Sequence, residues 1–433
     1  MSNLRKQIFS KTLPPIGPSS SKKLSSDNQK KASSIRNYTP IEWNTYFNDK
    51  RYITIDKNIF CLYSRNTNDL SSPVLFFLHG GGFSGLSWAL MSKAVTNLVQ
   101  CQCIAIDIRG HGETKTTDDN DLSIETLTND ICQILRHLFN EDNKPPIFLI
   151  GHSMGGALAV HVAKECPSMI DALCVIDVVE GSALESLSSM QCFLSSRPKQ
   201  FSTPQKAIEY IVRSGQVRNI ESARVSVIGQ IQPMITTQSN ETDSSSTIVS
   251  NPTFPAVSHL CETVREEDEE EENDGDHKSS GTFQQPTSTN NSNDTNKYTW
   301  RIDLSKTEKF WEGWFSGLSK LFLSCECPKL LLLAGVDRLD RDLTVGQMQG
   351  KFQMHVVPKS GHAVHEDAPE QVADCIASFL VRHKLVQAND EHFQATLPGY
   401  APEQVADCIA SFLVRHKLVQ ANDEHFQATL PGC

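Results

Sequence analysis

Runs of consecutive apolar residues recur along the chain, and each has the length of a strand rather than of a helix. Strands of a parallel sheet show such continuous runs when helices cover both faces of the sheet. The runs are Val74–Leu78, Cys103–Ile106, Ile147–Ile150, Leu173–Ile176 and Leu330–Leu333. The segment 352–357 has a similar length, but Gln353 and His355 interrupt its apolar residues. We therefore predict a strand at each of these positions.

Helical and alternating patterns separate these runs. Residues 123–139 follow the N-cap candidate Ser123 with helical apolar spacing, at Ile124, Leu127, Ile131, Ile134, Leu135 and Leu138. Ahead of the first run, the alternating segments 52–55 and 59–63 predict a hairpin. Strands that alternate with helices in this way indicate an α/β fold with a doubly wound, mostly parallel sheet.

A long insertion lies between the runs that end near Asp177 and Asp337. Residues 182–235 have helical patterns, while residues 236–297 are rich in Ser, Thr, Asn and acidic residues. Such a polar segment buries too little apolar surface to order itself. We predict a helical cap over residues 182–320, interrupted by a disordered acidic loop at 236–297.

The C-terminal part contains an exact repeat. Residues 368–399 recur letter for letter as residues 401–432, with Tyr400 between the copies. Structural repeats normally diverge in sequence and occur in arrays of three or more. We interpret 400–433 as a redundant duplicate or a gene-model artefact, and we assign 38–399 to one folded domain.

The first residues have a different composition. Residues 1–36 hold eight basic residues and the single acid Asp27, which predicts a disordered basic tail over residues 1–37. The thirteen cysteines of the chain include no Cys-x-x-Cys pair and mostly occupy apolar segments, as reduced intracellular cysteines do. We expect a cytoplasmic protein, with nuclear targeting through the basic tail as an alternative.

Charge and hydropathy indicate which classes of partner the chain does not bind. The net charge is −11, but residues 266–276 contribute nine acids and no base, and the remaining 42 acids face 40 bases. A nearly neutral globular part argues against nucleic acid as a partner. No apolar stretch reaches the length of a membrane span, so we expect no membrane partner either.

The strand at 147–150 leads into Gly151-His152-Ser153-Met154-Gly155 and then into a segment of small residues. A Gly-x-Ser-x-Gly sequence between a strand and a helix is typical of a nucleophile elbow, which exposes the serine on a sharp turn. We predict that Ser153 is a nucleophile. His152 is expected to shape this elbow rather than to titrate.

A glycine-rich loop follows the strand 74–78. In hydrolases with this order of elements, that loop presents backbone N–H groups to the developing oxyanion. We predict Gly81 or Gly82, together with the N–H of Met154, as oxyanion donors. A phosphate-binding loop is the weaker alternative, because no Lys follows at Walker spacing.

An acid and a histidine complete the predicted site. Asp177 and Asp337 each follow a buried strand, and the residue pattern does not decide between them as the acid of a triad. His362 follows the last strand and gives the order Ser, Asp, His. His365 is a rival base that could form a metal cluster with neighbouring acids, but its spacing matches no zinc motif. We expect no metal and no cofactor.

Several segments together resemble the protein phosphatase methylesterase family of α/β-hydrolases. They are Leu78–Gly82, Gly151–Ala157, Val175–Gly181, Ser189–Gln191, Asn219–Val227, Gly313–Phe315, Leu330–Leu343, Gly346–Met354 and Gly361–Pro369. The resemblance implies an α/β-hydrolase fold with Asp177 as the triad acid and His362 as the base. It also implies a substrate and partner, the methylated C-terminal leucine of the protein phosphatase 2A catalytic subunit.

Two other functions remain compatible with the pattern. A small-molecule carboxylesterase would share the triad but would need no protein partner. A non-catalytic phosphatase-binding protein would keep the cap without a requirement for Ser153.

Overall fold

The structure is a computed structural model that describes residues 36–67, 69, 71–234, 297–335 and 339–389. Contacts between residues separate 1–37 from 38–433, and the elements below all lie in the second unit. The predicted basic tail, apart from its last two residues, lies outside the described residues. So do almost all of the predicted acidic loop and the whole second copy of the repeat.

Eight strands of the described residues form one sheet in the order β1-β2-β4-β3-β5-β6-β9-β10. The antiparallel pairs are β1 with β2 and β2 with β4, and the other neighbours are parallel. The bounds are β1 Asp49–Ile55, β2 Asn58–Arg65, β3 Val74–Leu78, β4 Gln102–Ile106, β5 Ile147–His152, β6 Ala172–Ile176, β9 Lys329–Leu333 and β10 Gln353–Val356. The predicted hairpin and the predicted parallel strands are confirmed.

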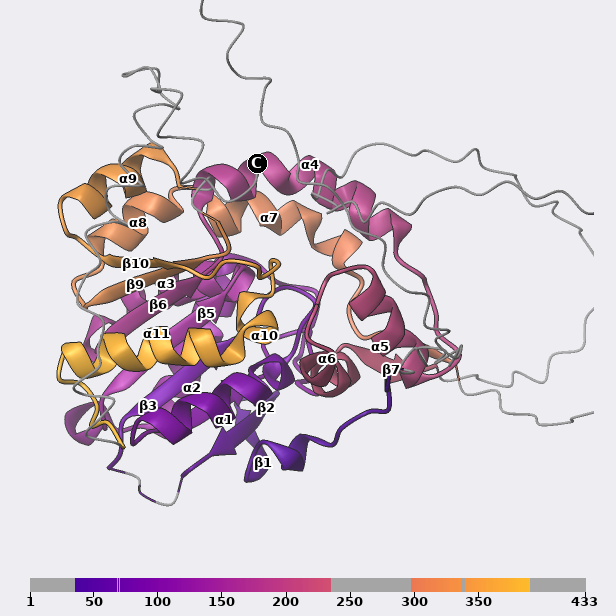
Figure 1. Cartoon of the computed structure of the whole chain (residues 1–433), viewed down its shortest axis with the longest axis horizontal. Coiled ribbons are helices and arrows are strands. Elements are labelled where there is room, and N and C mark those ends of the chain that lie inside the picture. Colours follow the sequence, from indigo (N-terminus) through magenta and orange to yellow (C-terminus); the bar gives the residue numbers. More distant parts are fainter. Residues whose placement is uncertain (1–35, 68, 70, 235–296, 336–338, 390–433) are drawn as a thin grey trace, which may run out of the picture. The chain divides into compact units, whose positions relative to one another are not determined.

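Helices cover the sheet and form the cap (Figure 1). The α-helices are α1 Ala89–Leu98, α2 Ile124–Leu138, α3 Met154–Glu165, α4 Glu180–Ser196, α5 Pro204–Arg213, α6 Ile220–Ser226, α7 Glu308–Phe315, α8 Leu318–Ser324, α9 Arg341–Met348, α10 Val364–Asp367 and α11 Pro369–Arg382. Short 3-10 helices are η1 Trp43–Thr45, η2 Gly85–Trp88, η3 Glu141–Asn143, η4 Pro167–Met169, η5 Val227–Gly229 and η6 Leu304–Thr307. None of the helices in the described residues is long and apolar enough to cross a membrane.

The sheet is buried on both faces. Alternate residues of β3 enter two different apolar clusters, with Phe76 in the first and Phe77 in the second. The first cluster contains the buried faces of α2 and α3, and the second contains those of α1 and α11. Figure 1 shows α1 and α11 side by side on the same face of the sheet. This two-sided burial explains why the strands have continuous apolar runs.

The cap is built from α4, α5, α6, α7 and a small two-stranded sheet. Thr203 caps α5, because its side chain accepts a hydrogen bond from the Lys206 N–H, and Pro204 occupies the first turn. A third apolar cluster lies in the cap and includes Ala363, the residue after His362. The cap core therefore packs directly against the loop of the predicted base.

One helix of the cap is shorter than its pattern indicates. Within the helical patterns predicted over 182–235, the last α-helix, α6, ends at Ser226, and η5 follows. Residues 231–233 then form β7, which pairs with β8 at Tyr298–Trp300 in an antiparallel arrangement. The pairing partner lies more than sixty residues away in the chain. A local hydrophobic period therefore cannot reveal this pairing.

Candidate active site

Ser153 lies on a strained turn between β5 and α3. Its φ is 52°, a value that costs an ordinary residue roughly 1–3 kcal/mol and is found mainly at functional sites. The turn is possible because a Cβ on Gly151 would lie 2.0 Å from the Gly155 carbonyl oxygen, and one on Gly155 would lie 2.3 Å from the Leu78 carbonyl oxygen. The two glycines therefore let the strand and helix approach closely enough to expose the serine.

His362 lies within hydrogen-bonding distance of two other predicted site residues, Ser153 and Asp177. His362 Nε2 is 3.0 Å from Ser153 Oγ, and His362 Nδ1 is 2.8 Å from Asp177 Oδ2. The carboxylate accepts, so Nδ1 carries the proton and Nε2 accepts from the serine hydroxyl. The Asp177 side chain is fully buried, whereas half of the His362 side chain is exposed. The arrangement has the geometry of a Ser-His-Asp triad.

The carboxylate of Asp177 is also held from a neighbouring strand. The Ala334 N–H, directly after β9, donates to Asp177 Oδ1 at 3.0 Å. One oxygen is thus fixed by the backbone and the other faces His362. The rival acid Asp337 lies outside the described residues.

His365, the rival base, is not the histidine that is hydrogen-bonded to Ser153. It lies in α10, fully buried, with its ring 4.1 Å from the Trp88 ring and 4.5 Å from the His152 ring between centroids. Burial lowers the pKa of His365 to about 3, so the ring stays neutral. Its position in the core is unlike that of a base that must face a substrate. No group of three or more His, Cys, Asp or Glu in the described part of the chain could hold a metal ion.

The glycine-rich loop forms a tight turn beside the elbow. The Phe83 N–H donates to the Gly80 carbonyl oxygen at 3.1 Å, and Gly82 has a φ of 82°, as the third residue of a type II turn requires. The Gly82 N–H donates to His111 Nε2 at 2.9 Å and is therefore already engaged. Of the two predicted donors of this loop, the geometry favours Gly81, next to the Met154 side chain.

Two buried histidines support this loop. His79 Nε2 accepts from the Ile108 N–H, so its Nδ1–H donates to the Gly80 carbonyl oxygen at 2.8 Å. His111 accepts from Gly82, so its Nδ1–H donates to the Arg109 carbonyl oxygen at 2.9 Å. Burial lowers the pKa of His111 to about 4 and keeps it an acceptor. Both tautomers follow from the hydrogen-bond partners.

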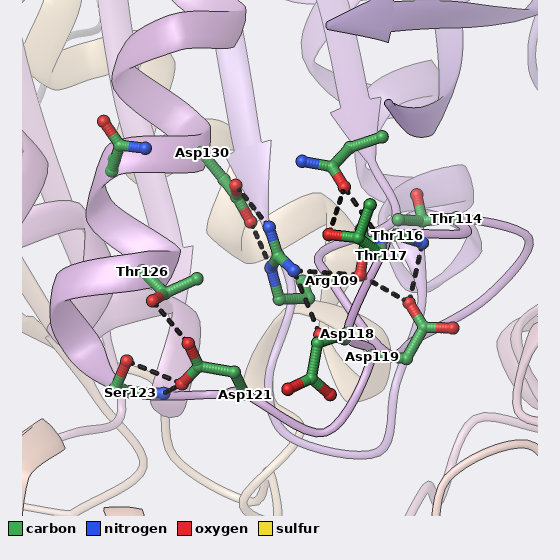
Figure 2. A network of polar contacts seen from close by, with 12 residues as sticks. Arg109, Thr114, Thr116, Thr117, Asp118, Asp119, Asp121, Ser123, Thr126 and Asp130 are labelled. Atoms are coloured by element: carbon green, nitrogen blue, oxygen red, sulfur yellow. Dashed lines mark hydrogen bonds and ion pairs between the residues drawn. The ribbon is translucent and has the colours of Figure 1, made fainter. Parts of the chain in front are cut away.

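Arg109 anchors the loop that carries His111 (Figure 2). Its guanidinium donates to both carboxylate oxygens of Asp130 in α2, at 2.6 and 2.8 Å, and to Thr116 Oγ1 and the Asp118 carbonyl oxygen. Asp130 was not among the predicted site residues. The available signal was an acid on the apolar face of the helix at 123–139, where a buried charge needs a partner.

The cap also contacts the glycine-rich loop after β3. A Cβ on Gly82 would lie only 2.8 Å from Cδ1 of Leu304, at the start of η6. The Phe83 side chain packs on the cap cluster. Leu304 was not among the predicted site residues, because an isolated Leu in a polar segment carries no signal. The glycine-rich loop therefore lies between the sheet and the cap.

A cavity of about 760 Å³ lies between the β1–β2 hairpin, the loop after β4 and the cap. Its lining includes Glu113, Lys115, Asp119, Trp300, Arg301 and Lys306. No residue of the triad lines it, so we do not place the reacting ester there.

Comparisons with known proteins agree with this geometry. The sequence profile described as Alpha/beta hydrolase family matches residues 75–375. The chain is 46% identical over 372 residues to protein phosphatase methylesterase 1 of Mus musculus. The aligned region covers 84% of this chain and 90% of the relative. It is 43% identical over 354 residues to the probable protein phosphatase methylesterase 1 of Caenorhabditis elegans, covering 81% and 80%.

A solved structure supports the fold alone. The crystal structure of E-2-(acetamidomethylene)succinate hydrolase superposes with a TM-score of 0.54 at 16% identity, over 77% of this chain and 99% of that chain. The sequence relatives are far more similar and carry the family assignment. The chain therefore belongs to the protein phosphatase methylesterase family, a group of esterases within the alpha/beta hydrolases.

Proposed function

We propose that this protein removes the methyl ester from the C-terminal leucine of the protein phosphatase 2A catalytic subunit. The observation that carries the proposal is the hydrogen-bonded chain Ser153–His362–Asp177 at a strained elbow. The names of the sequence relatives supply the substrate class.

In the first half-reaction, the Ser153 hydroxyl attacks the ester carbonyl while its proton moves to His362 Nε2. Asp177 orients the imidazole and stabilises its cation. The N–H groups of Gly81 and Met154 donate to the oxyanion, and one such donor contributes about 3 kcal/mol to the transition state. His362 then returns the proton to the leaving methoxy group, so methanol departs and an acyl-enzyme remains.

In the second half-reaction, water replaces methanol. His362 takes one proton of the water as its oxygen attacks the acyl carbon. The tetrahedral intermediate collapses, His362 protonates Ser153 Oγ, and the leucine leaves with a free carboxyl group that ionises at neutral pH. No metal or cofactor takes part in this scheme.

The enzyme must recognise the phosphatase subunit rather than the methyl group, because a methyl group offers little surface for binding. The cap supports this part of the proposal, because its apolar cluster packs on Phe83 beside the oxyanion loop and includes Ala363 beside His362. A polypeptide tail bound at Ser153 would therefore lie close to residues of the cap. We therefore propose the methylated tail of the catalytic subunit as the partner.

A cytoplasmic location fits the cysteines. All ten cysteines of the described residues are free thiols, although several lie in pairs such as Cys101 with Cys103. Most are buried in apolar surroundings, where reduced cysteines are stable. We propose the cytoplasm as the compartment, and microscopy of a fluorescent fusion tests it together with nuclear entry.

The substrate assignment is tested with three esters at equal concentration. These are the methylated phosphatase catalytic subunit, a peptide of its methylated tail, and leucine methyl ester. We expect the highest kcat/KM on the whole subunit, and we expect Ser153→Ala to bind the subunit without demethylating it. Equal kcat/KM on all three would indicate a small-molecule carboxylesterase. Binding without turnover by the wild type would indicate a non-catalytic phosphatase-binding protein.

A further inference from the structure

His152, the residue before the nucleophile, contacts the loop 357–363 between β10 and α10. This loop carries His362 and is called the base loop below. Its Nε2 lies 2.8 Å from the main-chain carbonyl oxygen of His362, and its side chain is completely buried. These two residues are 210 positions apart in the sequence. The contact therefore links the nucleophile elbow to the loop that follows β10.

The direction of this hydrogen bond is determined by its partner. A carbonyl oxygen can only accept, so Nε2 of His152 must carry the proton. Burial, with smaller contributions from His365 and His362, holds the pKa of His152 well below its usual range. The ring is therefore neutral, with its proton on Nε2 and none on Nδ1.

The surroundings of the ring hold it in place. A Cβ on Gly80 would lie 2.8 Å from His152 Nδ1, so the imidazole packs directly on the backbone of the oxyanion loop. The rings of Phe83, His362 and His365 lie 5.7, 4.8 and 4.5 Å from it between centroids. The ring touches the oxyanion loop and the base loop, and Ser153 follows it in the chain.

Other contacts also hold the base loop, including the burial of Ala363 in the cap cluster. Half of the His362 side chain is exposed, and its carbonyl oxygen also accepts from the Val364 N–H at 2.9 Å. The Gly361 N–H donates to Asp367 Oδ2 at 2.7 Å. The bond from His152 ties the backbone of the base loop to the elbow.

We propose that His152 is a positioning residue, whose Nε2–H bond to the His362 carbonyl holds the His362 imidazole in line between Ser153 and Asp177. This inference rests on the proposed catalytic roles of those three residues. Catalysis is sensitive to such alignment, since a displacement of about 1 Å can cost roughly 100-fold in rate. His152 itself exchanges no proton with the substrate.

Two variants separate the hydrogen bond from the volume of the side chain. His152→Leu removes the donor, whereas His152→Gln places an amide N–H near the position of Nε2. The first readout is covalent labelling of Ser153 by a fluorophosphonate, which requires an aligned triad but no phosphatase. The second is kcat and KM on a methyl ester, and thermal melting reports folding.

We expect His152→Leu to lower the labelling rate and kcat about 10-fold or more with KM nearly unchanged. His152→Gln should recover most of both. Equal labelling rates in the two variants, or wild-type rates in His152→Leu, would overturn the inference. If neither variant folds, nitrogen-15 NMR of the wild type decides. A proton on Nε2 of His152 supports the inference, and a proton on Nδ1 refutes it.

The proposed substrate can be refuted independently of the proposed role of His152. Normal fluorophosphonate labelling of the wild type without any release of methyl groups from the phosphatase would refute the substrate and leave the role of His152 standing.

Discussion

Asp177 Oδ2 and His362 Nδ1 lie 2.8 Å apart, although the residues are 185 positions apart in the sequence. Asp177 follows β6, and His362 follows β10, which lies beyond β9 in the sheet. The N–H that follows β9 holds the other oxygen of the carboxylate. Three neighbouring parallel strands therefore orient one imidazole, because their carboxyl ends meet at the same edge of the sheet.

Asp177→Asn should lower kcat by about 10³- to 10⁴-fold with little change in KM or melting temperature. The amide would donate where the carboxylate accepts, which favours the His362 tautomer that cannot take the serine proton. Steady-state kinetics on a methyl ester measure this effect. Asp142→Asn, at an exposed position of η3, is the matched control. A kcat within tenfold of wild type would refute the assignment of the acid.

Gly82→Ala should destabilise the protein and lower kcat, whereas Gly81→Ala should have little effect on either. A side chain at Gly82 meets a positive φ, which costs about 1–2 kcal/mol, and also the Leu304 side chain at 2.8 Å. At Gly81 the nearest atoms lie at ordinary contact distances of 3.7 and 3.9 Å. Both variants keep their backbone N–H groups. Thermal melting and kcat of the pair test this, and equal effects would contradict the described turn.

Asp130→Asn should reduce the free energy of unfolding by about 3 kcal/mol, because it removes the carboxylate that pairs with the buried guanidinium of Arg109. Both side chains are only 6% exposed. A smaller loss of kcat should accompany it, since Arg109 carries the carbonyl that orients His111. Chemical denaturation gives the stability. Glu209→Gln weakens two surface ion pairs, with Lys206 and Arg213, and should change stability little. A similar loss in both variants would contradict the expected role of Asp130.

Glu366→Gln should raise the melting temperature at pH 8 but hardly at pH 4. Burial raises the pKa of Glu366 from 4.5 to about 8, so the folded protein keeps a proton that the unfolded chain releases above pH 4.5. The resulting stabilisation is complete below pH 4.5 and is lost as pH rises toward 8. The neutral amide avoids this loss. Melting curves of both proteins across this range test the sign, and a benefit only at low pH would contradict it.

The local patterns of the sequence predicted most of the sheet and the strand ends at which Ser153, Asp177 and His362 lie. Continuous apolar runs mark strands such as β3, because both faces of the sheet are covered. Ser153 and His362 could be predicted because each occupies a fixed position after a strand. The choice of Asp177 over Asp337 required the family resemblance, since both positions have the same local pattern.

Contacts between distant segments could not be predicted in this way. The pairing of β7 with β8 joins residues on either side of a long polar segment. The bond from Gly82 to His111, which favours Gly81 as the loop donor, depends on the exact course of two loops. Hydrophobic periodicity indicates which face of a helix or strand is buried. It does not indicate which other segment packs against that face.

The most direct test of the central claim is single-turnover release of methanol from the methylated phosphatase catalytic subunit. We would compare the wild type, Ser153→Ala and the control Ser168→Ala, whose serine is exposed in η4. We expect a loss on the order of 10⁴- to 10⁶-fold for Ser153→Ala and wild-type rates for the control. Release by Ser153→Ala within tenfold of the wild type would contradict Ser153 as the nucleophile.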